Sequence, residues 1–302
     1  MDSLIVSSTS LLAAALFALL PPLLDGVERK VKAKIQTRYG PPTVLQTWYD
    51  LMKLWVKELK IPTSGESSFL LVSLSLLTAI TALYPLAYMI VTLHTQLDPL
   101  LLALPLTLVA SSHGLMLITS ISTSNPFAVI GSYRSMFLTL LNEFGLVSGS
   151  VIAVYTGLRL ASNHTLSTAM TYLLSLLILS FSTYVGGGRL PFDIHEAEPE
   201  LASGVLIELS SKLLALYIYT HLLMRYVLTL LMSVAFIAPL TPVITTPTAL
   251  PVTLLISFIL YIAYGIIAVT LGRTRVDIGV KTLFIYYLVT LIVLVIFTCL
   301  SI

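Results

Sequence analysis

The sequence predicts an all-α integral membrane protein, a bundle of about eight transmembrane helices with a cytoplasmic amphipathic helix and an acidic cytoplasmic loop. Two observations carry this prediction. The chain of 302 residues is 57% hydrophobic and only 10% charged, with a mean hydropathy of +0.98, far from the composition of a soluble domain. Apolar runs of about twenty residues without charge, long enough to cross a bilayer as helices, also recur along the chain.

We expect spans at residues 4–24, 68–92, 99–121, 127–158, 166–187, 205–237, 250–272 and 281–301. The whole chain, residues 1–302, then forms a single membrane domain. Two connections stand out within it, a basic one over residues 25–62 and an acidic loop over residues 186–204. The first span is expected to be a retained helix, because Asp2 precedes it and positive charge follows it, the reverse of a cleaved signal peptide.

Lysine and arginine are concentrated in the connections on one side of the predicted bundle. These residues are Arg29, Lys30, Lys32, Lys34, Arg38, Lys53, Lys57, Lys60, Arg189, Arg273, Arg275 and Lys281, with Arg134 near its end of the fourth span. The opposite connections contain only Arg159. By the positive-inside rule the basic side is cytoplasmic, and an even number of spans places both termini on the outer side of the cell membrane.

The basic connection contains a predicted amphipathic helix after the Gly40-Pro41-Pro42 turn. Apolar residues recur at helical spacing opposite charged ones. The apolar positions are Leu45, Trp48, Leu51, Met52, Trp55 and Leu59, and the charged ones are Asp50, Lys53, Lys57 and Lys60. Such a helix either lies on anionic lipid or docks a soluble partner, and the sequence leaves both readings open.

Glu143 lies near the middle of the fourth expected span. A lone carboxylate inside a bilayer costs about 2.5–3.5 kcal/mol on insertion scales, so we expect it to face the bundle or a water-filled cavity. Close behind it, Gly145 and Gly149 form a pair of small residues four apart, which allows a neighbouring helix to approach closely.

The stretch GGGRLPFDIHEAEPELASGVLIELSSK, residues 186–212, concentrates the acidic residues of the chain. Asp193, Glu196, Glu198, Glu200 and Glu208 supply five of its fourteen carboxylates within sixteen positions. Glycines end the preceding helix and Pro191 opposes its continuation, so a loop is predicted. Carboxylates at alternate positions do not share one helical face, and some are expected to face a polar cavity. The alternative is an acidic surface loop.

The next helix is expected to begin near Ala202. Glu208 and Lys212 would then lie four residues apart, in the order that favours an ion pair. His221 and Arg225 share a face of the same helix. Arg225 either takes part in ion transfer, or extends to the interface or pairs with a helix end.

Several functions are excluded by what the sequence lacks. A single cysteine, Cys299, rules out disulfides and a self-contained cysteine-based iron–sulfur or zinc site. The five histidines have no metal-ligand spacing. There is no phosphate-binding glycine loop, nucleophilic triad or nucleic-acid-binding pattern. We therefore expect no cofactor in this chain, and any redox metal should belong to a partner.

The segment RLPFDIHEAEPELASGVLIELSSK resembles the RxPFDxxEAExELxxGxxxEYSxxK signature of the membrane subunit that anchors the peripheral arm of respiratory complex I. Related subunits occur in energy-converting membrane-bound nickel–iron hydrogenases and in sulfur-reducing complexes. The segments ERKVKAKIQTRYGP, GSYRSMFLTLLNE and RTRVD resemble the same family. The compact GPPTVLQTWYDLMKL connection is similar to the hydrogenase type. Leu209 replaces the usual tyrosine, and Thr220 and His221 stand where complex I relatives often have glutamate.

The resemblance implies a non-catalytic anchor and energy-coupling subunit of an oxidoreductase complex. Its cytoplasmic loops would hold a large catalytic subunit and a small iron–sulfur subunit, whose iron–sulfur clusters and nickel–iron or related site perform the redox chemistry. Antiporter-like membrane subunits would receive the energy and move H⁺ or Na⁺. The expected ion-path residues are Glu143, Asp193, Glu196, Glu198, Glu200, Glu208, Lys212, His221 and Arg225. The expected docking residues are Arg29, Lys30, Lys34, Gln36, Arg38, Trp48, Asp50, Lys53, Trp55, Arg134, Arg189 and Phe192.

Two other functions compete with this one. The chain could be the quinone-channel subunit of an NADH:quinone oxidoreductase, or a self-contained secondary ion transporter that uses Glu143 and Glu208 at a midplane site. A transporter of that kind often has inverted repeats and paired broken helices, and none is evident in the sequence.

Overall fold

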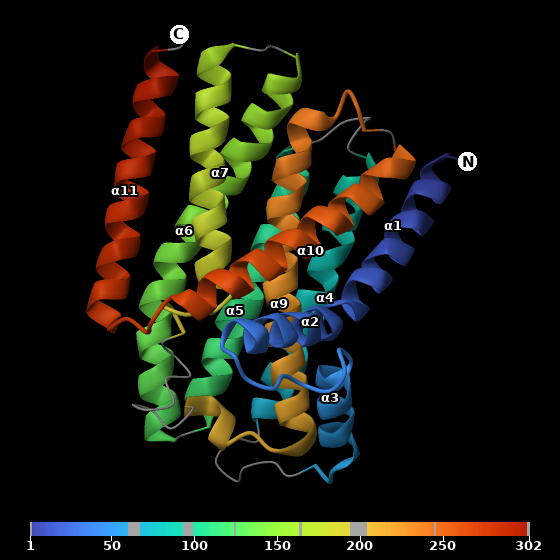
Figure 1. Cartoon of the computed structure of the whole chain (residues 1–302), viewed down its shortest axis with the longest axis vertical. Helices are drawn as coiled ribbons and strands as arrows, with labels where there is room; N and C mark the ends of the chain where they lie inside the picture. Colours follow the sequence, from blue (N-terminus) through green and yellow to red (C-terminus); the bar gives the residue numbers. More distant parts are fainter. Residues whose placement is uncertain are drawn as a thin grey trace.

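Figure 1 shows the computed structural model of the protein, which describes residues 2–59, 67–92, 99–123, 125–162, 165–193, 204–244 and 246–300. Its α-helices are α1 (Asp2–Leu19), α2 (Pro21–Ile35), α3 (Gln46–Val56), α4 (Ser67–Thr92), α5 (Pro99–Ser122), α6 (Pro126–Ser162), α7 (Leu166–Gly186), α9 (Ser211–Ile237), α10 (Thr246–Thr270) and α11 (Val276–Leu300), with short 3₁₀ helices η1 (Gly204–Ile207) and η2 (Ala238–Leu240). Within these ranges, eight helical segments are long and apolar enough to cross a membrane, which confirms the predicted fold class.

The bundle is built around α9, the orange helix near the centre of Figure 1. In its most apolar stretch 83% of the residues are buried, compared with 17% for α11 at the edge of the bundle. Helices α3, α4, α7 and α10 all pack against α9. The two ends of the chain lie at one end of the bundle, and α3 and η1 lie at the other (Figure 1). We call the end with α3 and η1 the α3 end.

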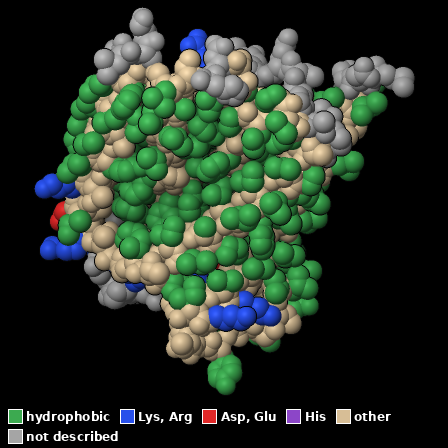
Figure 2. Space-filling view, turned by 45° about the horizontal axis from the view of Figure 1, so that its top comes forward, with side chains coloured by type: hydrophobic (Ala, Val, Ile, Leu, Met, Phe, Trp, Pro, Cys, Tyr) green, Lys and Arg blue, Asp and Glu red, His purple; other side chains and the backbone are tan. Residues whose placement is uncertain are grey.

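The flank of the bundle is apolar, as a lipid-facing surface requires. Figure 2 shows hydrophobic side chains over most of the visible face, with lysine and arginine gathered toward its edges. Leucines of α1 are well exposed, among them Leu4, Leu12 and Leu19. A multi-pass membrane protein is the class of molecule that this surface and these helices define.

The first expected span is longer than one straight helix. Helix α1 ends at Leu19, and Pro21 and Pro22 begin α2, which Figure 1 shows crossing the bundle at a different angle and which continues to Ile35. Prolines fit the first helical turn because the N–H groups that they lack would have no helical partner there. The bend brings the charged part of α2 beneath α10 and α9 instead of leaving it in solvent.

The predicted start of the sixth span was wrong. After η1 the chain turns, and α9 begins only at Ser211. Glu208 therefore precedes the helix, and its Oε1 accepts a hydrogen bond from Asn125 Nδ2 at 2.7 Å, just before α6. Because Glu208 is outside α9, it lacks the helical spacing to Lys212 on which the predicted ion pair depended, and that pair does not form.

The prediction that Gly145 and Gly149 admit neighbouring helices is confirmed. A Cβ at Gly149 would lie 2.9 Å from the backbone nitrogen of Leu179, so the missing side chain lets α7 pack directly on α6. At Gly145 a Cβ would lie 2.3 Å from the ring of Tyr287 in α11. The Tyr287 hydroxyl then donates to Asn142 Oδ1 at 2.8 Å, which ties α11 to the middle of α6.

Candidate functional site: buried ionisable groups and two cavities

Glu143 faces the bundle, as the sequence predicted. Its Oε1 lies 2.9 Å from Nδ1 of His113 in α5, and both side chains are mostly buried, with 19% and 14% exposed. Glu143 Oε2 is buried and has no hydrogen-bond partner among the described residues. The structure therefore places a carboxylate and an imidazole in direct contact inside the membrane domain.

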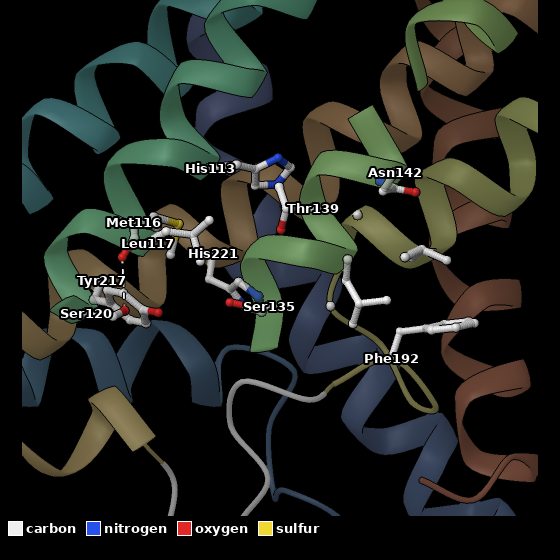
Figure 3. Close-up of a pocket in the computed structure, with 14 residues that line it drawn as sticks. His113, Met116, Leu117, Ser120, Ser135, Thr139, Asn142, Phe192, Tyr217 and His221 are labelled. Atoms are coloured by element: carbon white, nitrogen blue, oxygen red, sulfur yellow. Dashed lines mark hydrogen bonds between the residues drawn. The ribbon is translucent and has the colours of Figure 1, made fainter. Parts of the chain in front are cut away.

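An inner cavity of about 80 Å³ lies beside this pair, among α5, α6, α7 and α9. Figure 3 shows His113, Thr139, Ser135, Tyr217 and His221 around it. A volume of this size holds several water molecules, and the imidazoles, hydroxyls and amide in its wall supply partners for them. Glu143 thus reaches a polar cavity through His113.

An outer cavity of about 260 Å³ lies among α2, α3 and α9. Tyr217 and His221 line it as well as the inner cavity, so they form the wall between the two. On the α2 side, Asp25 Oδ2 accepts a hydrogen bond from Thr47 at 2.8 Å, and Arg29 contacts Asp50 at 3.2 Å. The outer cavity therefore begins at an ionisable network near the α3 end of the bundle.

A second buried cluster fixes the start of the acidic loop. Arg189 contacts both carboxylate oxygens of Glu28 in α2, at 3.0 and 2.9 Å, and only 3% and 2% of these two side chains are exposed. Lys32 approaches Glu28 at 2.6 Å, and the Arg189 guanidinium lies over the Tyr261 ring, 4.8 Å from its centroid. Gly265 makes room, because a Cβ there would lie 2.6 Å from Cγ of Glu28.

Arg225 binds the end of α7. Its Nε and Nη2 donate to the backbone oxygens of Gly187 and Gly188 at 2.7 and 3.1 Å. A guanidinium at the carbonyl end of a helix also complements the helix dipole. Arg225 therefore pairs with a helix end and also lines the outer cavity, and its role in ion transfer stays a prediction.

The acidic residues of the loop are described only in part. Asp193 lies 3.9 Å from Arg273, in the connection between α10 and α11. Glu196, Glu198 and Glu200 lie outside the described residues, so their predicted cavity is neither confirmed nor contradicted. Lys212 lies in the first turn of α9 and is partly buried.

The predicted docking residues divide by exposure. Arg29, Lys34, Gln36, Arg38, Lys53 and Trp55 are exposed, and Lys30, Trp48, Asp50 and Arg134 are partly buried. Arg189 and Phe192 are buried, so their contacts are with this chain. Arg189 holds Glu28, and Phe192 packs edge-on against Phe181, with ring centroids 5.7 Å apart. Their role in docking a partner is not tested by these contacts and stays a prediction.

Sequence reasoning missed Asp25, Glu28 and His113. Glu28 belongs to the ERKVKAKIQTRYGP segment, and the local pattern there does not predict the bend that buries α2. His113 lies in an apolar span, where an ionisable side chain is itself a signal of function. Among the described residues, no three histidine, cysteine, aspartate or glutamate side chains gather as metal ligands.

The fold and the site define a multi-pass membrane subunit with a buried line of ionisable groups. The chain belongs to the NADH dehydrogenase family, whose model matches residues 7–299. It is 29% identical over 278 residues to hydrogenase-4 component C of Escherichia coli (strain K12), covering 88% of each chain. It is 34% identical over 211 residues to formate hydrogenlyase subunit 4 of the same organism, covering 66% of each.

Complex I relatives match as well. NADH-ubiquinone oxidoreductase chain 1 of Coturnix japonica is 31% identical over 281 residues, which cover 84% of this chain and 85% of that one. Among solved structures, a chain of the membrane-bound sulfane sulfur reductase, an archaeal respiratory membrane complex, has the same fold, with a TM-score of 0.75 and 21% identity over 98% of this chain and 99% of that chain. The family predicted from the sequence motifs is therefore confirmed.

Proposed function

We propose that this chain is the membrane anchor and energy-coupling subunit of a multisubunit respiratory complex. It docks a cytoplasmic redox module and links electron transfer in that module to ion translocation. The observation that carries the proposal is the continuous run of ionisable groups, from Asp25 and Arg29 through the outer cavity, Tyr217 and His221 to the inner cavity and Glu143. Family membership over nearly the whole chain supports it.

The redox chemistry belongs to partners in this proposal. Iron–sulfur clusters and a nickel–iron or related site would lie in the hydrophilic large and small subunits, and antiporter-like membrane subunits would move the ion. The α3 end would face the cytoplasm and both termini the outside, because the lysines and arginines gather at the α3 end. A hydrogenase-type module fits the two Escherichia coli relatives, which are named as hydrogenase and hydrogenlyase components.

The docking surface would be the exposed face of α2, α3 and their connection. A depression of about 290 Å³ there is lined by Arg29, Lys32 and Arg38 together with Asp50, an excess of positive charge that suits an acidic partner segment. Trp55 is 51% exposed and lines an apolar groove of α3 that faces Leu76 of α4 and Tyr219 of α9. Trp48 instead lies 6.4 Å from the Tyr219 ring of α9 and holds α3 on the bundle.

Replacing Trp55 by alanine is expected to release much of the redox module from washed membranes while the membrane domain keeps its stability. Trp48→Ala should instead lower the thermal unfolding midpoint, since it removes a contact within the chain. Immunoblots of partner subunits on washed membranes, and thermal unfolding in detergent, measure the two effects. Full retention of the partner by the Trp55 variant would favour the alternative that α3 lies on lipid.

The coupling role is tested by Glu143→Gln, which keeps the shape of the side chain and removes its charge. We expect electron transfer in the assembled complex to continue, while the number of ions moved per electron into sealed vesicles falls by more than about half, because a relay group that does not change protonation state blocks the route. Glu58→Gln, in an exposed position after α3, is the matched control and should pump normally. Normal pumping by the Glu143 variant would remove this carboxylate from the route.

A further inference from the structure

Histidine, and not only carboxylate, lies along the buried route. His221 stands in the wall between the outer and inner cavities, and His113 stands between the inner cavity and Glu143. Figure 3 shows both side chains at the inner cavity, on different helices. Among the described residues, no group of three histidine, cysteine, aspartate or glutamate side chains includes either imidazole.

The contacts of His113 suit proton transfer. Its Nδ1 is engaged with Glu143 Oε1 at 2.9 Å, while Nε2 makes no hydrogen bond to a described residue although the ring lines the cavity. An imidazole arranged in this way can accept a proton from cavity water at one nitrogen and donate the proton on the other. Glu143 Oε1 is then a direct acceptor.

The same wall is poor for a sodium ion. A hard cation takes several oxygen ligands, and a carboxylate among them helps to offset its lost hydration. The described lining of the inner cavity includes no carboxylate, and the Asn142 amide oxygen already accepts hydrogen bonds from Tyr287 at 2.8 Å and Ser182 at 3.2 Å. Glu143 itself does not line this cavity, and its Oε1 is engaged by His113 at 2.9 Å.

We propose that the ion carried through this subunit is a proton, relayed from the outer cavity to Glu143 by His221 and then His113. The inference rests on the proposed coupling function and specifies its ion and its carriers. His221 takes a proton from outer-cavity water on one ring nitrogen and releases the proton of the other to inner-cavity water. His113 takes a proton on Nε2 and gives its Nδ1 proton to ionised Glu143. Each ring ends with its original charge and with its proton on the other nitrogen, and rotation of the ring restores the starting arrangement.

The test uses His221→Ala and His113→Ala in the assembled complex, in sealed vesicles with and without added imidazole. Each variant should lose most proton translocation per electron while electron transfer continues. Imidazole at millimolar concentration should restore part of it, because the deleted ring leaves space beside the cavity and a soluble imidazole supplies the missing carrier. A structural defect would not respond in this way. His113→Gln can still hydrogen bond to Glu143 but cannot relay a proton. It therefore tests the relay even if the alanine variant fails to fold.

Glu58→Gln, at an exposed position that lines neither cavity, is the control, and it should pump normally with no response to imidazole. Two results would overturn the relay: histidine variants that pump normally, or lost pumping that imidazole leaves unchanged in both. Sodium uptake that survives a protonophore in the wild-type complex would overturn the choice of ion. A failure of the proposed function is distinguishable, because Glu143→Gln itself would then pump normally.

Discussion

Replacing Arg189 by methionine is expected to destabilise the protein by about 3 kcal/mol, because it leaves the Glu28 carboxylate buried without its main partner. Both side chains are almost fully buried, and Arg189 contacts each oxygen of Glu28. Removal of one member of a buried pair typically costs about 3–5 kcal/mol. The lower value applies here, since Lys32 remains 2.6 Å from the carboxylate. Residues 189–193 should lose their fixed position at the same time.

If the loss of stability comes from the unpaired charge of Glu28, a double variant that removes both charges should be more stable than Arg189→Met alone. Glu28→Gln combined with Arg189→Met removes both charges, so it should regain much of the lost stability, as apolar or neutral replacements of buried pairs often do. Arg159→Met is the control, because Arg159 is exposed and stacks only on Tyr155, and its change should stay within about 0.5 kcal/mol. Thermal unfolding in detergent reports all three. Equal midpoints for Arg189→Met and Arg159→Met would show that the buried pair contributes nothing.

The features that the sequence predicted correctly depend on residues close together in the chain. Apolar runs of bilayer length located the spans, because the bilayer fixes that length independently of the packing. The cost of a charge in lipid predicted that Glu143 faces the bundle. The space that glycine leaves predicted that other helices pack closely at Gly145 and Gly149. The motif at 189–212 identified the family because its residue types are unusual in so apolar a chain.

The features that were not predicted depend on contacts between distant segments. Glu28 and Arg189 are 161 residues apart, and Gly265 of α10 makes their contact possible. The local sequence pattern does not indicate that these three residues lie together, because their contact depends on the bend at Pro21. Glu208 was misplaced for the same reason, since its partner Asn125 lies 83 positions away and competes with the helical spacing that favoured Lys212.

Replacing Gly26 by alanine is the sharpest test of the close contact between α2 and the connection that leads to α3. A Cβ at this position would lie 1.8 Å from the carbonyl oxygen of Val44 and 2.8 Å from its carbonyl carbon. Alanine is a better helix former than glycine by about 1 kcal/mol, so local propensity alone predicts a more stable protein. The clash is with backbone, which cannot rotate away, and overpacking of this kind costs about 1–3 kcal/mol or more. We therefore expect net destabilisation.

Gly114→Ala separates the two effects. Gly114 is in helix α5, and a Cβ there meets no atom within 4 Å, so this variant should be neutral or slightly more stable. The Gly26 variant should instead unfold at a lower temperature and become sensitive to protease between α2 and α3, because the connection must leave Val44's present position for the methyl group to fit. The Asp25–Thr47 hydrogen bond of 2.8 Å lies next to the clash, so the wall of the outer cavity should open too. If Gly26→Ala and Gly114→Ala had the same unfolding temperature and the same protease sensitivity, the close packing of α2 against the connection to α3 would be wrong.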